Sequence, residues 1–166
     1  DTSPGRGSVF AFTLPLPEPL AAHPRHDLPL PPAADFGGLR ALVAEDNPYN
    51  RFLLQKILQK LGVGQADFAS DGQEAVRQVL AARDADAPYH VIFMDVRMPI
   101  LDGLEAARSL REYGVTTPIV ALTAQAAEDD DALCRQAGMN AYFSKPYRIN
   151  DIEAVLAELA ANRTEP

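Results

Sequence analysis

"HVIFMDVRMP", residues 90–99, joins a run of four apolar residues to an aspartate, Asp95, and then to a turn. A short apolar run without strict alternation is typical of a strand that is buried on both faces. Such strands belong to parallel sheets that carry helices on either side. The stretch therefore predicts a parallel α/β sheet, with Asp95 at the carboxyl end of its most hydrophobic strand.

Four more strands are predicted around this one, at residues 39–44, 66–70, 118–123 and 141–144. The segments between them carry apolar residues three and four positions apart, which is the spacing of a helix face. Five strands alternating with five helices indicate βαβ units with right-handed crossovers. We therefore predict a three-layer, doubly wound (βα)5 sandwich with a parallel five-stranded sheet over residues 38–161.

Two of the predicted helices begin with a capping signature. Asp71 with Glu74, and Asn150 with Glu153, place a capping residue three positions before a glutamate. The helix around residues 127–137 is the poorest of the five, because its early turns are acidic.

Four of the five strands end in a polar residue capable of chemistry: Glu45 with Asp46, Asp95, Thr123 and Lys145. In an open α/β sheet, ligands bind at the edge formed by the carboxyl ends of the strands. An acid after a strand is usually a loop residue or a helix cap, and a single lysine there means little. Their coincidence at four strands indicates a site.

Three carboxylates that converge on one edge repel one another. Two unit charges about 5 Å apart, at an effective dielectric near 20, cost roughly 3 kcal/mol. A hard divalent cation such as Mg²⁺ would offset this repulsion, and Mg²⁺ commonly bridges carboxylates to phosphate. Lys145 would add a point charge beside a phosphoryl oxygen and Thr123 a hydrogen bond. The pattern therefore favours phosphoryl transfer onto Asp95.

The segments "LVAEDNPYNRFLLQKILQKLG", "VIFMDVRMPILDGLEA", "PIVALTA" and "AGMNAYFSKP" resemble the receiver domain of two-component response regulators. More narrowly, "EDNPYN" is similar to the form frequent in receivers attached to hybrid sensor histidine kinases. The resemblance covers about residues 39–160. It implies a flavodoxin-like sheet of strand order 2-1-3-4-5. It also implies a module that accepts a phosphoryl group from phosphohistidine and changes shape to pass on or regulate a signal.

The resemblance assigns roles to the acidic residues. Asp95 would be the phosphoacceptor. Mg²⁺ would be held by Asp46, Asp95 and the backbone carbonyl of Arg97, with Glu45 acting on the metal through water.

It also implies roles at the last two strands. Thr123 and Lys145 would bind the phosphoryl group, and the Lys145–Pro146 peptide bond would be cis. Tyr142 matches the aromatic switch residue of the family, which turns inward when Thr123 moves toward the phosphoryl group.

Four features depart from the family pattern or need an interpretation of their own. His90 stands where an aspartate is frequent, and we interpret it as a surface residue. Tyr147 stands where phenylalanine or an aliphatic residue is usual. The acidic run 128–131 favours a solvated, repulsive face over a dimer interface. Cys134 is interpreted as a small buried residue.

The receiver resemblance does not explain "SPGRGSVFAFTLPL", residues 4–17. This stretch resembles the closing strand of the ATP-binding domain of histidine kinases. We therefore assign residues 1–17 to a remnant of that domain, 18–37 to a proline-rich linker, and 162–166 to a tail. Seven of the 14 prolines lie within residues 15–32. A terminal arm of a free-standing regulator is the alternative.

Composition narrows the partners. The net charge of −8 argues against a nucleic-acid or anionic-membrane surface. The single cysteine excludes an internal disulfide framework and a cysteine zinc site. No membrane span or signal-peptide pattern is present, so we expect this fragment in the cytoplasm without membrane contact, although its parent protein could be membrane-anchored.

The expected partners are the phosphohistidine donor domain of a histidine kinase, in the same or a partner chain, and a downstream histidine phosphotransfer protein. Kinase motifs are absent from the sequence, so the fragment is not expected to use ATP, whereas a hybrid parent would be a histidine kinase. Two other functions stay open. A pseudo-receiver would only bind partners, and a haloacid-dehalogenase-type phosphohydrolase would use Asp95 as nucleophile. The second type has an aspartate where this chain has Arg97.

Overall fold

The computed structural model describes residues 2–3, 7–8, 36–124 and 128–161. The chain divides into two units, residues 1–33 and 34–166. In the first unit, β1 (Thr2–Ser3) pairs antiparallel with β2 (Gly7–Ser8). The rest of the predicted opening strand and the proline-rich segment lie outside the described residues.

The second unit is built on a sheet of five parallel strands. In chain order they are β3 (Arg40–Ala44), β4 (Gln65–Ala69), β5 (Val91–Asp95), β6 (Ile119–Thr123) and β7 (Ala141–Ser144). In space they follow the order β4-β3-β5-β6-β7. Numbered from the first strand of this sheet, that order is 2-1-3-4-5, and the predicted topology is confirmed.

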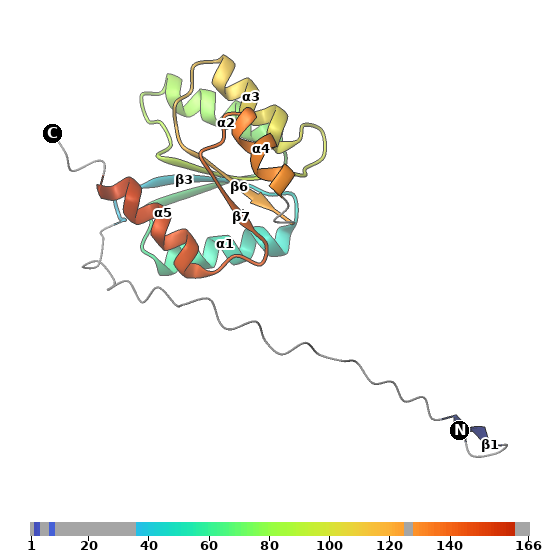
Figure 1. The fold of residues 1–166 in the computed structure, drawn as a ribbon. Helices are drawn as coiled ribbons and strands as arrows, with labels where there is room; N and C mark the ends of the chain where they lie inside the picture. Colours follow the sequence, from blue (N-terminus) through green and yellow to red (C-terminus); the bar gives the residue numbers. More distant parts are fainter. Residues whose placement is uncertain (1, 4–6, 9–35, 125–127, 162–166) are drawn as a thin grey trace. The chain divides into compact units, whose positions relative to one another are not determined.

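Five helices cover the two faces of this sheet. They are α1 (Pro48–Lys60), α2 (Gly72–Asp84), α3 (Gly103–Glu112), α4 (Glu128–Gln136) and α5 (Ile149–Ala161). Helices α1 and α5 lie on one face, and α2, α3 and α4 lie on the other (Figure 1). The three-layer sandwich is therefore confirmed.

Successive residues of the central strands face opposite layers of the core. Ile92 and Met94 of β5 pack on the side of α2 and α3, whereas Phe93 packs with the residues of α1 and α5. Every residue of β5 and β6 is buried, including Asp95 and Thr123 at their ends. The continuous apolar runs that predicted these strands thus reflect burial on both faces.

The two predicted capping signatures fare differently. The side chain of Asp71 accepts the Glu74 N–H at 2.8 Å and begins α2, as predicted, while Glu74 accepts the N–H of Ser70. The prediction that Asn150 caps the last helix is wrong, because α5 already begins at Ile149. There Asp151 accepts the N–H of Arg148.

The structure also corrects one interpretation of a single residue and confirms another. His90 is half-buried, and its Nδ1 accepts the backbone N–H of Arg40 at 2.9 Å, so it is an internal bridge between β3 and the start of β5. Cys134 is buried, as predicted. Within the described ranges, no helix is both long and apolar enough to cross a membrane.

Candidate functional site

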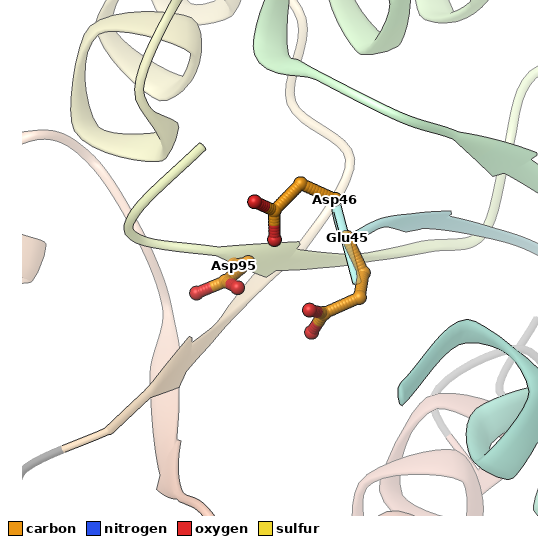
Figure 2. A group of neighbouring side chains, drawn as sticks. All are labelled: Glu45, Asp46 and Asp95. Atoms are coloured by element: carbon orange, nitrogen blue, oxygen red, sulfur yellow. The ribbon is translucent and has the colours of Figure 1, made fainter. Parts of the chain in front are cut away.

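The carboxyl ends of β3 and β5 bring three acidic side chains together. Glu45 and Asp46 follow β3 directly, and Asp95 is the last residue of β5. One carboxylate oxygen of each residue lies within 4.8 Å of the others. Figure 2 shows the Asp46 carboxylate turned toward Asp95, whereas the Glu45 side chain extends away from that of Asp46. Glu45 is wholly buried and Asp95 nearly so, whereas Asp46 is exposed.

Lys145, directly after β7, neutralises part of this charge. Its Nζ lies 2.7 Å from Oε2 of Glu45 and 2.7 Å from Oδ2 of Asp95. Burial alone would lower the pKa of Lys145, but its hydrogen bonds and attraction to Asp95 and Glu45 outweigh burial and raise that pKa. The ammonium group therefore stays charged between the two buried carboxylates.

The surroundings of Asp95 disfavour the ionised form of its carboxyl group. Burial, first of all, raises the pKa of its carboxyl, and the neighbouring charge of Glu45 raises it further. The hydrogen bond from Lys145 and the Arg97 N–H, 3.2 Å from Oδ1, act in the opposite direction without cancelling these effects. A carboxylate in this position gains from any additional positive charge.

The backbone behind Asp95 is pinned by a glycine at the start of α3. Gly103 donates its N–H to the carbonyl of Val96 at 3.0 Å. A Cβ on Gly103 would fall 2.1 Å from the carbonyl oxygen of Asp95. Only glycine therefore permits the close approach of α3 to the end of β5.

Two residues of α1 hold the acidic loop, and the sequence assigned a role to neither. Nδ2 of Asn50 donates to Oε1 of Glu45 at 2.9 Å. The Arg51 guanidinium donates to the carbonyls of Glu45 at 2.7 Å and Asp46 at 3.1 Å. Asn50 closes the "EDNPYN" motif, and both residues stand within the first turn after Asn47, the N-cap of α1, and so face back to the end of β3.

The remaining predicted residues lie on β6, on β7 and after β7. Thr123 ends β6 and is buried, and its carbonyl accepts the Lys145 N–H at 2.7 Å. The Lys145–Pro146 peptide bond is cis. Tyr142 of β7 is 40% exposed, so its ring stands toward solvent. The structure thus gathers Glu45, Asp46, Asp95 and Lys145 at one edge, with Thr123 on the neighbouring strand.

The donor set fits a hard divalent cation. All three side chains offer carboxylate oxygens, and the cluster carries three negative charges against the one positive charge of Lys145. Fold and site together define a doubly wound α/β domain whose sheet ends in an acidic, cation-ready edge.

Comparison with known proteins places this domain in a family. The model of the response regulator receiver domain matches residues 41–157. The chain therefore belongs to the response regulator receiver family, and it is a receiver domain over most of its length.

Curated relatives include both large kinases and small regulators. The osmosensing histidine protein kinase SLN1 of Saccharomyces cerevisiae is 38% identical over 124 residues, which are 74% of this chain and 10% of that protein. The two-component response regulator ORR41 of Oryza sativa subsp. japonica is 39% identical, with 72% of this chain and 93% of that protein covered. The sensor protein EvgS of Escherichia coli is 32% identical over 96% of this chain, but only 13% of EvgS is covered.

Solved structures agree on the fold. The receiver domain of the sensor histidine kinase PA1611 of Pseudomonas aeruginosa, with a magnesium ion coordinated in its active site cleft, has a TM-score of 0.66 and 38% identity. The match covers 75% of this chain and 98% of that one. The receiver domain of Ssk1 from Saccharomyces cerevisiae, crystallised with the histidine phosphotransfer protein Ypd1, has a TM-score of 0.68 and 28% identity. That match covers 76% of this chain and 92% of the other. These findings do not favour the phosphohydrolase or pseudo-receiver alternatives.

Proposed function

We propose that this domain accepts a phosphoryl group on Asp95 in a Mg²⁺-dependent phosphorelay. One observation carries the proposal: Lys145 bridges two buried carboxylates, Asp95 and Glu45, beside the exposed carboxylate of Asp46. Such a site is suited to bind a divalent cation together with a phosphoryl group, and to accept that group covalently on Asp95.

The metal would be held by Asp46, Asp95 and the backbone carbonyl of Arg97, with Glu45 acting through water. When bound, Mg²⁺ supplies positive charge to the phosphoryl oxygens in the transition state. The magnesium ion of the PA1611 receiver domain supports this assignment.

The transfer itself is a displacement at phosphorus. An oxygen of Asp95 attacks, a new O–P bond forms, and the P–N bond of the donor phosphohistidine breaks. The electron pair of that bond passes to the imidazole nitrogen of the donor. Lys145, already within hydrogen-bond distance of Asp95, stabilises the charge on the phosphoryl oxygens, and the Thr123 hydroxyl donates a hydrogen bond to one of them.

The response is a change on the face of α4, β7 and α5. Thr123 would move toward the phosphoryl group, and the Tyr142 ring would leave its solvent-facing position to fill the space behind it. The 40% exposure of Tyr142 fits the arrangement expected before phosphorylation.

The wider setting follows from the relatives. SLN1 and EvgS are a histidine kinase and a sensor protein of which this chain matches about a tenth, so we infer a hybrid histidine kinase as parent. Within it, residues 1–17 are the closing strand of the ATP-binding domain, 18–37 the linker, 38–161 the receiver domain and 162–166 a tail. The donor is a phosphohistidine domain of the same or a partner chain, in the cytoplasm. The Ssk1–Ypd1 complex supports a downstream histidine phosphotransfer protein as a further partner.

The test is phosphorylation of the full chain by phosphoramidate, a small donor with a P–N bond, in the presence of Mg²⁺. Intact mass is expected to increase by one phosphoryl group in the wild type and in Asp86→Asn, a control in an exposed loop. Asp95→Asn is expected to gain none, and omission of Mg²⁺ is expected to prevent the gain. Equal labelling of Asp95→Asn and wild type would refute the assignment.

A further inference from the structure

Tyr147 carries a buried polar group that the proposed function does not use. Its side chain is 8% exposed, and its hydroxyl has no hydrogen-bond partner among the described residues. Buried hydroxyl groups are normally paired, because an unsatisfied one loses its bonds to water without replacement. The other buried tyrosine, Tyr89, follows that rule and donates to Asp67 at 2.8 Å. The exception at Tyr147 therefore calls for an explanation.

The hydroxyl group belongs to a side chain that borders the acidic site. Tyr147 lines a cavity of about 330 Å³ together with Asn50 and Lys145, the two side chains that hydrogen-bond to the Glu45 carboxylate. Burial, and after it the charges of Glu45 and Asp95, raise the pKa of Tyr147. The hydroxyl group thus keeps its proton and is available as a donor.

The Glu45 carboxylate, in turn, has one oxygen whose partner is about to move. Oε1 accepts from Asn50 at 2.9 Å and from the Asn47 N–H at 3.3 Å. Oε2 accepts from Lys145, the same ammonium group that contacts Asp95. If Asp95 is phosphorylated, Lys145 follows the phosphoryl oxygens, and Oε2 of the fully buried Glu45 loses this donor. A buried charge without that donor would oppose the phosphorylated state.

We propose that the Tyr147 hydroxyl is the reserve donor for Glu45, replacing Lys145 when Lys145 turns to the phosphoryl group. Tyr147 is then a positioning residue: it touches neither the phosphorus nor the metal, but it keeps Glu45 in place while the lysine moves. The Tyr147 hydroxyl, which has no partner at rest among the described residues, would then donate to the oxygen that Lys145 leaves. This inference rests on the proposed function of Asp95 and Lys145.

The test compares Tyr147→Phe with Tyr89→Phe in the full chain, since each removes one buried hydroxyl group. Three quantities are measured: stability to urea without metal, affinity for Mg²⁺, and affinity of the Mg²⁺-loaded protein for beryllofluoride, a mimic of the phosphoryl group. Tyr147→Phe is expected to be at least as stable as wild type and to bind Mg²⁺ equally well, but to bind beryllofluoride about tenfold more weakly or worse. Tyr89→Phe is expected to lose stability and to bind beryllofluoride like wild type.

Two results would overturn the proposal. Wild-type beryllofluoride affinity in Tyr147→Phe would show that the hydroxyl group is not needed in the activated state. A loss of urea stability as large as that of Tyr89→Phe would show that the hydroxyl group already has a partner at rest. Either result leaves the proposed function intact if the wild type binds beryllofluoride. A wild type that binds none overturns both.

Discussion

The two edges of the same sheet are built on opposite principles. At the amino edge, where β3 begins, the Arg40 guanidinium donates to Gln65 at 3.1 Å and lies 3.7 Å from a carboxylate oxygen of Asp67. It also stacks on the Tyr89 ring, 5.1 Å from the centroid, and donates to the carbonyl of Ala87. The Tyr89 hydroxyl completes the group by its bond to Asp67. One cation faces one anion, and each of these donor groups has an acceptor.

At the carboxyl edge the balance fails. Three carboxylates face one lysine, and a buried tyrosine hydroxyl close by has no partner among the described residues. The same fold produces both edges, so the imbalance is a property of the side chains that the strands deliver. We infer that the contacts at the amino edge stabilise the fold, whereas the uncompensated negative charge at the carboxyl edge is suited to bind a ligand.

The largest expected effect is a loss of stability on substitution of Arg111, which lies on the side of the sheet where the strands begin. Its guanidinium donates to the carbonyls of Gly138, Val115 and Thr117 and to Oδ1 of Asn140. Arg111→Met removes the donor for these acceptors, and we expect a loss of roughly 3 kcal/mol in the free energy of unfolding.

Urea unfolding measures that loss, and Arg108→Met on the exposed side of α3 is the control, with an expected change within about 0.5 kcal/mol. Folded Arg111→Met should still be phosphorylated on Asp95. Loss of phosphorylation in a folded variant, with stability unchanged, would break the division between the two edges.

A smaller effect contrasts two carboxyl groups at the carboxyl ends of the strands. Hydrogen bonds from Ser70, first from its backbone N–H and then from its hydroxyl, lower the pKa of Glu74, whereas burial and then Glu45 raise the pKa of Asp95. Glu74 therefore contributes stability above its unfolded pKa and loses it as the pH falls through the lowered folded value. For Asp95 the sign is reversed, and rising pH costs stability as its carboxyl ionises.

Carbon-detected NMR titration of the side-chain carboxyls, without metal, measures both groups. We expect the Glu74 pKa below the usual glutamate value and the Asp95 pKa above the usual aspartate value. Mg²⁺ should lower the apparent pKa of Asp95 and leave that of Glu74 unchanged. Shifts of the same sign in both groups would mean that Asp95 does not carry the uncompensated charge that the account assigns to it.

Most of the sheet could be predicted from the sequence, because strands buried on both faces appear as short, continuous apolar runs. The sequence also predicted that Glu45, Asp46, Asp95 and Lys145 meet, since parallel strands end at one edge. The roles of these residues in phosphoryl transfer stay predictions.

Other features depended on long-range or local geometry that no spacing reveals. The sequence predicts a surface position for His90 and misses its bond to the Arg40 N–H. That bond joins residues 50 positions apart in the chain, and no local pattern indicates it. The predicted cap at Asn150 is wrong, because α5 begins at Ile149, two residues before the start that such a cap implies. The contacts of Asn50 and Arg51 with the acidic loop likewise appear only when α1 is placed over the end of β3.

The central claim is that the carboxyl edge holds uncompensated negative charge that a cation completes. Urea unfolding of Asp46→Asn, with and without Mg²⁺, tests it most directly, with Asp86→Asn as the control. Without metal, Asp46→Asn is expected to be about 1 kcal/mol more stable than wild type, because it removes one repelling charge. With Mg²⁺, the wild type and Asp86→Asn should gain stability, and Asp46→Asn should gain much less. An Asp46→Asn variant that is less stable without metal, yet gains as much from Mg²⁺ as the wild type, would contradict the account.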